Sequence, residues 1–447
     1  MKHTKTWKMR IILLCLFLSI RLITIAQWSN VGSTSISSAW TTYNDIAIDT
    51  SGVPVVLFNE SSSNLKCKKY DGAQWQDVGL STFNFPWGGN TQLMVDSVYN
   101  TYYISYSDVN NNYTSVIKYN GSIWSYVGNQ YIVNESVNDF VIAIDNTGVL
   151  YCAFLSSSGF QLFKENANNW QQITTSGLVT PLSNIAITFD HQNNLLLAFT
   201  NMNNLSASCM KLNGTVWQQV GNSNITSGAF AQYNKIKVSE TNEIYFATQN
   251  INTCCYKLNA SNIWQQLGVS GLGFNYIGID DLIIDKYNQP YIITSQIASD
   301  KANCVYYNGG SWVKSCENSI SDTTASSVAM EINAQSVIYA IFNDFAEGKA
   351  FVRNCVSVNN INDLENNISF KIYPNPFNNE ATLQTDYILN NATLTIVNYF
   401  GQPIKQINNI RGQTLTISRK NLASGLYFVR LIERNRFVSQ AKLLIID

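Results

Sequence analysis

Tryptophan recurs along this chain at nearly constant intervals of 46 to 49 residues. The members of the series are Trp28, Trp75, Trp124, Trp170, Trp217, Trp264 and Trp312. Five of them are followed four residues later by glycine, and six are preceded by a turn dipeptide such as Asp71-Gly72. Such dipeptides tolerate the positive φ of tight turns, so each of them predicts a hairpin. A fixed period of this length indicates a repeat architecture, in which each repeat is one supersecondary unit.

A second hairpin precedes each turn dipeptide. Its first strand ends at Asp49, Asp96, Asp145, Asp190, Ser239, Asp285 and Asn333, which are again nearly evenly spaced. Its second strand is almost wholly apolar, as in residues 55–58 and 195–199, and such a run indicates a strand that is covered on both faces. Four strands per repeat is the content of one blade of a β-propeller.

The order of the strands favours a closed ring. The chain begins with a lone fourth strand around Trp28, continues through six complete repeats, and finishes with the first three strands of a repeat near Arg353. An open stack would leave both fragments with unpaired strand edges, which β-proteins avoid. The sequence therefore predicts an all-β fold, a seven-bladed β-propeller in which the N-terminal strand closes the last blade.

Residues 1–26 have the pattern of a signal peptide. Lysines and an arginine precede an apolar run at 11–20, and Thr24-Ile25-Ala26 places small residues before a cleavage point. The run is shorter than the roughly 20 residues that span a bilayer, and no later stretch has that character. We therefore expect an exported protein without a permanent transmembrane segment. The formal net charge of −1 argues against a nucleic-acid partner.

The C-terminal segment has a different pattern from the repeats. Tyr373-Pro374-Asn375-Pro376, a turn at Gly401 after an apolar strand, Gly425-Leu426-Tyr427 and a terminal lysine followed by apolar residues together resemble the type A C-terminal sorting domain of the type IX secretion system of Bacteroidetes. The resemblance implies a small Ig-like β-sandwich that engages the secretion machinery and is usually removed at the outer membrane. It also implies a cargo that is released or fixed to the cell surface. The expected domains are 1–26 signal peptide, 27–355 propeller, 356–367 linker and 368–447 sorting domain.

Eight of the nine cysteines follow the leader. Cys304 and Cys316 flank the predicted turn at Asn308-Gly309, which would place them roughly opposite each other on one hairpin. Export makes a disulfide between them feasible, and free buried thiols are the alternative.

Most repeated polar and aromatic residues have structural explanations. We interpret the seven tryptophans as packing residues of the outer hairpins, and the recurring aspartates as turn residues that bind their own backbone. His191 is the only histidine after the leader, so we expect no histidine-based metal site and no Ser-His-Asp arrangement. No cofactor, metal site or catalytic residue is predicted.

The loops that join the fourth strand of one blade to the first strand of the next are the predicted ligand site. In a propeller these loops surround one mouth of the central channel. Four of them place an aromatic residue nine positions before the hairpin turn: Trp40, Trp87, Phe230 and Tyr276. Aromatic rings beside Asn, Ser and Thr suit a neutral carbohydrate, although such rings could equally plug the seams between blades.

We therefore expect an exported binding protein, with glycans as the favoured ligands. An alternative is a glycan-cleaving enzyme on the same face, because two carboxylates suffice for that chemistry. The carboxylates near the predicted loops are Glu60, Asp108, Glu135, Asp139, Asp280, Asp281 and Asp344. A structural surface protein that binds partners through the propeller rim is the third hypothesis.

Overall fold

The computed structural model describes residues 26–32, 35–60, 64–79, 87–226, 230–250, 252–268, 272, 276–296, 301–356, 370–398, 403–420, 422–433 and 436–446. All regular elements in these ranges are strands. The signal peptide predicted at 1–26 and the linker predicted at 356–367 lie almost wholly outside the described residues.

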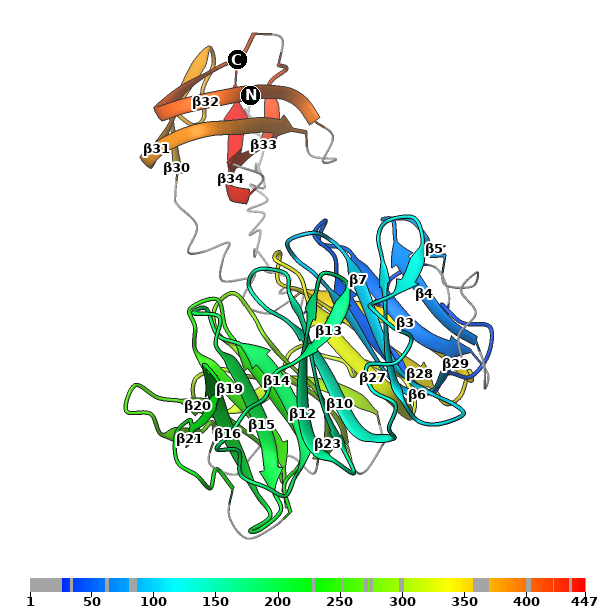
Figure 1. The fold of residues 1–447 in the computed structure, drawn as a ribbon. Coiled ribbons are helices and arrows are strands. Elements are labelled where there is room, and N and C mark those ends of the chain that lie inside the picture. The colour runs from blue at the N-terminus through cyan, green and yellow to red at the C-terminus, as the bar shows by residue number, and fades with distance from the viewer. Residues whose placement is uncertain are drawn as a thin grey trace, which may run out of the picture.

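Seven four-stranded antiparallel sheets form the blades of a propeller (Figure 1). Blade 1 contains β2 (Asn44–Ile48), β3 (Pro54–Glu60), β4 (Asn64–Tyr70) and β5 (Trp75–Asp77). Blade 2 contains β6 (Trp87–Val95), β7 (Tyr102–Asp108), β8 (Thr114–Tyr119) and β9 (Trp124–Tyr126). Blade 3 contains β10 (Val137–Ile144), β11 (Leu150–Ser156), β12 (Gly159–Asn166) and β13 (Asn169–Gln172). Blade 4 contains β14 (Leu182–Phe189), β15 (Leu195–Asn201), β16 (Ser206–Asn213) and β17 (Val216–Gln219). Blade 5 contains β18 (Gln232–Val238), β19 (Ile244–Gln249), β20 (Thr253–Leu258) and β21 (Trp264–Gln266). Blade 6 contains β23 (Tyr276–Ile284), β24 (Pro290–Gln296), β25 (Ala302–Tyr307) and β26 (Trp312–Lys314). Blade 7 contains β27 (Ala325–Ile332), β28 (Val337–Asp344), β29 (Lys349–Val356) and β1 (Ser29–Asn30).

The last blade is closed by the N-terminal strand, as the strand order predicts. β1 pairs with β29 in the register Ser29 to Asn354, and the N–H of Val31 donates to the carbonyl of Val352. The second strand of each blade is its most enclosed, because neighbouring blades cover both of its faces; every residue of β3 and β7 is buried. The prediction of a seven-bladed propeller closed in this way is confirmed.

A disulfide reinforces the closure, but it is not the pair expected from the sequence. Cys316 is bonded to Cys355 of β29, whereas Cys304 is a free buried thiol. The predicted Cys304–Cys316 pair is therefore wrong. The residue opposite Cys304 is Ser315, whose N–H donates to the Cys304 carbonyl, so Cys316 lies one position beyond that partner. The bond that forms links the end of blade 6 to blade 7.

The repeated tryptophans pack between blades and also join them. Five of the seven are less than a tenth exposed. In five cases the indole N–H donates to the carbonyl that lies three residues after the tryptophan of the preceding blade, as from Trp264 Nε1 to Val220 O at 2.9 Å and from Trp170 Nε1 to Val127 O at 2.8 Å. The same bond links Trp75 to Val31, Trp124 to Val78 and Trp312 to Leu267. The tryptophan therefore links successive blades, and we call this contact, with its hydrogen bond, the tryptophan fastener.

At three of the repeats, at Gly32, Gly128 and Gly221, the glycine four residues after the tryptophan makes room for the indole of the next blade. At Gly221 φ is +71°, and a Cβ there would lie 2.4 Å from Cδ1 of Trp264. Blade 3 carries Thr174 at the equivalent position, and the indole nitrogen that follows it, Nε1 of Trp217, has no hydrogen-bond partner among the described residues. The fastening bond is thus missing in the described structure at a repeat where the glycine is absent.

The C-terminal segment forms one five-stranded sheet with its own apolar core. Its strands are β30 (Phe370–Tyr373), β31 (Glu380–Val397), β32 (Pro403–Ser418), β33 (Gly425–Glu433) and β34 (Arg436–Ile445). β31 pairs with β30, β32 and β33, and β34 also contacts β30, so the sheet nearly closes on itself. An Ig-like sandwich in the strict sense stays a prediction.

Candidate ligand-binding cavities

The innermost strands of the seven blades enclose a central cavity of about 1060 Å³, here called the channel. Its wall is built from β2, β6, β10, β14, β18, β23 and β27. The residue four positions before each hairpin-turn position lies in this wall in every blade. These residues are Asp45, Gln92, Val141, Ala186, Lys235, Asp281 and Ala329.

Several polar side chains of the wall bind the next blade. Oδ2 of Asp45 accepts the N–H of Leu93 at 2.6 Å, and Oδ2 of Asp139 accepts the N–H of Ile185 at 3.0 Å. Gln92 does the same with its Oε1 and the N–H of Ile142 at 3.0 Å. Ile185 lies in a register irregularity of β14, whereas Leu93 and Ile142 lie in regularly paired stretches of the innermost strands, which are edge strands whose outward N–H groups have no partner in their own sheet. Part of the channel's polarity therefore serves the joints between blades.

Six of the eight acidic and basic side chains that line the channel gather on one side, and the other two, Asp139 and Asp145, belong to blade 3. Blades 5, 6, 7 and 1 are consecutive around the ring and present Lys235, Lys237, Asp280, Asp281, Glu331 and Asp45. Blades 2 to 4 present mainly neutral side chains, among them Gln92, Met94 and Thr188. We call the six charged residues the charged arc. A register shift in β23 between Ile277 and Asp281 accompanies the two consecutive carboxylates of blade 6.

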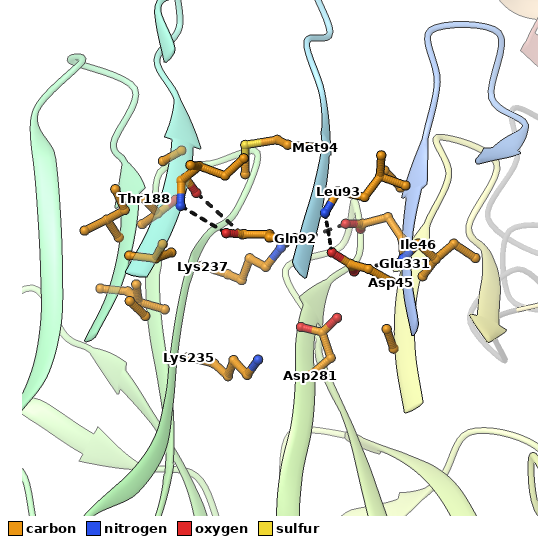
Figure 2. Close-up of a pocket in the computed structure, with 18 of the residues that line it drawn as sticks. Asp45, Ile46, Gln92, Leu93, Met94, Thr188, Lys235, Lys237, Asp281 and Glu331 are labelled. Atoms are coloured by element: carbon orange, nitrogen blue, oxygen red, sulfur yellow. Dashed lines mark hydrogen bonds and ion pairs between the residues drawn. The ribbon is translucent and has the colours of Figure 1, made fainter. Parts of the chain in front are cut away.

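One ion pair crosses the charged arc. Nζ of Lys237 on β18 lies 3.9 Å from Oε2 of Glu331 on β27, so the pair passes over β23 (Figure 2). Lys237 stands closer to the hairpin turns than Lys235 does, two residues farther along the same strand. Figure 2 also shows Lys235 and Asp281 pointing toward each other on the side away from that pair.

The seven strands enclose the charged arc and shift the pKa values of several of its carboxyl groups. The side chains of the arc still keep partial contact with the solvent of the channel. Burial is the largest cause that raises the pKa of Asp45 to about 7, with the negative charge of Asp281 adding to it. Burial likewise raises the pKa of Asp280 to about 7 against the opposing effect of Lys235. For Glu331 burial raises the pKa and Lys237 lowers it. The channel can therefore take up or release protons near neutral pH.

A second cavity of about 590 Å³ lies at the seam between blades 3 and 4, here called the seam pocket. Its apolar lining comes from Leu155, Phe160, Pro181 and Leu182. Amide and hydroxyl groups of Asn138, Ser156, Thr180, Ser183 and Asn184 complete the wall. Asp139 lines both cavities, so the seam pocket adjoins the channel at that residue. The pocket includes the loop before β14 and the turn between β11 and β12, on the face named in the sequence prediction.

The four aromatic residues predicted as ligand contacts are not gathered in these cavities. Trp40 is 38% exposed and makes an edge-to-face contact with Phe345 at a ring separation of 4.6 Å. Phe230 is half-buried, and neither it nor Trp40 lines the channel or the seam pocket. The side chains of Trp87 and Tyr276 lie outside the described residues, so their role stays a prediction.

The predicted carboxylates divide into two groups. Asp139, Asp280 and Asp281 lie in the channel. The others are engaged near loops of the same face: Glu60 with Lys66 and Ser38, Asp108 with Tyr131, Glu135 with Ser158, and Asp344 with Thr323. Asp45, Lys235 and Lys237 were missed by the sequence reasoning. The signal that could have found them is their position relative to the hairpin turns, since Asp45, Lys235 and Asp281 share one repeat position.

The residues that the structure describes hold no group of three or more His, Cys, Asp or Glu side chains placed to bind a metal ion. No helix among them has the length and apolar character needed to cross a membrane.

Comparison with solved structures shows the fold of the body. A fungal alcohol oxidase of the AA5 family, in complex with copper, is similar at a TM-score of 0.53 and 10% identity over 94% of this chain and 99% of that chain. The GH74 xyloglucanase from Xanthomonas campestris is similar at a TM-score of 0.52 and 12% identity over 81% of this chain and 60% of that chain. At such identities the similarity extends to the fold alone. No curated protein sequence matches the chain.

The C-terminal segment has a family match. Residues 371–446 match the family described as secretion system C-terminal sorting domain, which confirms the resemblance drawn from Tyr373-Pro374-Asn375-Pro376 and the later motifs. Such a domain implies contact with the type IX secretion machinery and placement outside the cell or on its outer surface. The chain therefore carries a secretion system C-terminal sorting domain after a seven-bladed β-propeller.

Proposed function

We propose that the propeller is a glycan-binding module that uses the face on which the seam pocket opens. The observation that carries the proposal is the lining of that pocket. Phe160 and Pro181 offer apolar surfaces for sugar C–H groups, and the neighbouring amides and hydroxyls offer partners for sugar hydroxyls. Ligand pockets of this kind combine a mostly apolar wall with a few placed polar groups.

The volume of the seam pocket also suits a small sugar ligand. A volume of about 590 Å³ lies within the range typical of small-molecule sites. Among the described residues that line the seam pocket, Asp139 is the only acidic or basic one, its Oδ2 already accepts the N–H of Ile185, and burial raises its pKa. A wall with so little free charge suits a neutral sugar. Trp40, Trp87, Phe230 and Tyr276 remain candidate contacts for a longer glycan, of which Trp40 has an exposed ring.

The test is binding of the purified chain to a glycan array and to insoluble polysaccharides. Phe160→Leu keeps apolar bulk but removes the flat ring, so binding should weaken at least about fivefold, which corresponds to roughly 1 kcal/mol of lost ring contact. Tyr99→Leu is the matched control, because Tyr99 is 70% exposed in the turn between β6 and β7, on the opposite face. Equal loss in both variants, or no glycan bound by the unaltered chain, would contradict the proposal.

Glycan cleavage is a second candidate function, favoured by one feature of the channel. Asp45, Asp280 and Asp281 share that cavity, and the raised pKa values of Asp45 and Asp280 could keep one carboxyl protonated beside an ionised one. An acid and a base of this kind are what glycosidases require. Release of reducing ends from bound glycans that Asp280→Asn and Asp281→Asn both abolish would support it. Unchanged release in these variants would remove it.

A further inference from the structure

The charged arc has more acidic groups than basic ones, with the four carboxyl groups of Asp45, Asp280, Asp281 and Glu331 beside Lys235 and Lys237. Asp139 and Asp145 of blade 3 add two further carboxyl groups to the lining of the channel. Asp145 accepts N–H groups of its own hairpin turn, and Asp45 and Asp139 accept N–H groups of the next blade. These hydrogen bonds stabilise individual carboxylates, and once Asp45 and Asp280 ionise, above a pH of about 7, the channel carries an excess of negative charge.

Two members of the arc have no partner of their own. Neither Lys235 nor Asp280 makes a hydrogen bond or an ion pair with any residue that the structure describes, although the positive charge of Lys235 opposes the rise in the pKa of Asp280. A charge held in a partly enclosed site without a partner is costly, and proteins normally pair such groups. The space between these side chains is therefore suited to a ligand that supplies a charged or polar group.

Uncharged groups of the wall also have unused hydrogen-bonding capacity. Asn234 is 5% exposed and Asn44 is half-buried, and both line the channel. Their Oδ1 atoms are buried and have no donor among the described residues. An unpaired amide oxygen requires an N–H or O–H group, so these two positions favour a ligand that donates hydrogen bonds.

Aromatic rings stand near the ends of the wall strands where the loops enter. Tyr233 is 52% exposed and Tyr43 is 38% exposed, and both line the same cavity. Each lies two residues before a charged member of the arc, Lys235 and Asp45 respectively. The face of a tyrosine ring attracts cations. A cation that enters past these rings would therefore meet attraction first from the rings and then from the carboxylates.

From these contacts we infer that the channel binds an ammonium group, most suitably the amine of an amino sugar within a bound glycan. The inference rests on the proposed function as far as the glycan is concerned. The ammonium supplies the missing positive charge to Asp280 and Asp281 and donates N–H groups to the wall. A bound inorganic cation would need converging ligands, and the described residues hold no such group.

The experiment measures binding by titration calorimetry with two matched pairs of probes. The first pair is a glucosamine disaccharide and its N-acetylated counterpart, which differ in the amine. The second is choline and its neutral isostere 3,3-dimethylbutan-1-ol, which tests an ammonium that does not come from a sugar. The charged member of a pair should bind at least about fivefold more tightly, because a half-buried carboxylate attracts a cation strongly at short range.

Variants locate the effect in the channel. Asp280→Asn should remove most of the preference for the charged probe, and Lys235→Met should increase it, since a competing cation is lost. Asp77→Asn is the control, because Asp77 is an acidic residue of the outer strand β5 and its side chain is 68% exposed. Choline binding should also strengthen between pH 6 and pH 8, as Asp45 and Asp280 ionise beside Asp281, Glu331 and the two lysines.

The outcomes separate this inference from the proposed function. Equal affinity for charged and neutral probes in both pairs would overturn it, as would a preference that survives Asp280→Asn. Binding of neutral glycans that Phe160→Leu weakens, without any preference for ammonium, would leave the proposed function standing alone. Binding of choline without binding of any glycan would refute the proposed function and support an ammonium site for small molecules.

Discussion

Replacement of Gly221 by alanine tests whether the tryptophan fastener depends on the missing side chain. Gly221 has φ of +71°, and an added Cβ would lie 2.4 Å from Cδ1 and 2.5 Å from Nε1 of Trp264. No pair of heavy atoms that are not bonded can remain so close, so the indole must move. That movement breaks its 2.9 Å hydrogen bond to the carbonyl of Val220.

The cost has two separable parts. The left-handed backbone costs alanine about 1 kcal/mol, and loss of the bond to a buried carbonyl costs about 1–3 kcal/mol more. Gly214→Ala is the matched control, since Gly214 has φ of +62° and no atom within 4 Å of its added Cβ. The control should therefore lose about 1 kcal/mol, and Gly221→Ala about 3 kcal/mol.

The assay is urea unfolding of the purified chain and its two variants, followed by tryptophan fluorescence. The difference in the free energy of unfolding between the variants isolates the contact with Trp264. Equal losses within about 0.5 kcal/mol, near the usual precision of additive comparisons, would refute the idea that the glycine is required by the indole of the next blade.

Two further predictions concern closure and acid stability. Cys316→Ser removes the bond to Cys355, and because that bond closes 39 residues it should cost about 4 kcal/mol on the chain-entropy view; a reductant should destabilise the unaltered chain but leave the variant unchanged in the same unfolding assay. Glu60 has its pKa lowered to about 2, because hydrogen bonds from Lys66 and Ser38 outweigh the effect of burial. Its stabilisation should therefore be complete above the unfolded value of 4.5 and be lost as pH falls toward 2, so Glu60→Gln should flatten the fall in thermal stability across that interval.

The fold was predictable because its determinants are local and repeated. A turn dipeptide, a tryptophan and a glycine recur in one order, and each acts within its own hairpin or on the adjacent blade. The closing strand could be placed because a fragment at one end of the chain complements a fragment at the other. The disulfide could not be placed in this way. Its partners, Cys316 and Cys355, come together only when blade 7 docks against blade 6. The geometry of a single hairpin does not specify the distance between residues of two different blades.

The candidate site was only partly predictable. Attention to aromatic residues in the loops identified Trp40, which is exposed but lies outside both cavities. Phe160 of the seam pocket was missed because it belongs to the third strand of its blade, and its neighbour Pro181 comes from the next blade. The paired carboxylates of blade 6 depend on a register shift in β23, and register is set by pairing between strands and not by the residues of one strand.

Comparison of the seven repeats with one another indicates where function can reside in such a ring. At the tryptophan position all seven blades carry the same residue, because each indole must fill the same space against its neighbour. At the channel position the seven repeats carry five different residue types, from charged to apolar: Asp45, Gln92, Val141, Ala186, Lys235, Asp281 and Ala329. Asp45, Gln92 and Asp281 at this position accept an N–H of the next blade, and the neutral amide of Gln92 makes that joint without a charge. The joint therefore does not require charge, and the concentration of charge on four consecutive blades is the feature of the propeller that most needs a binding partner to explain it.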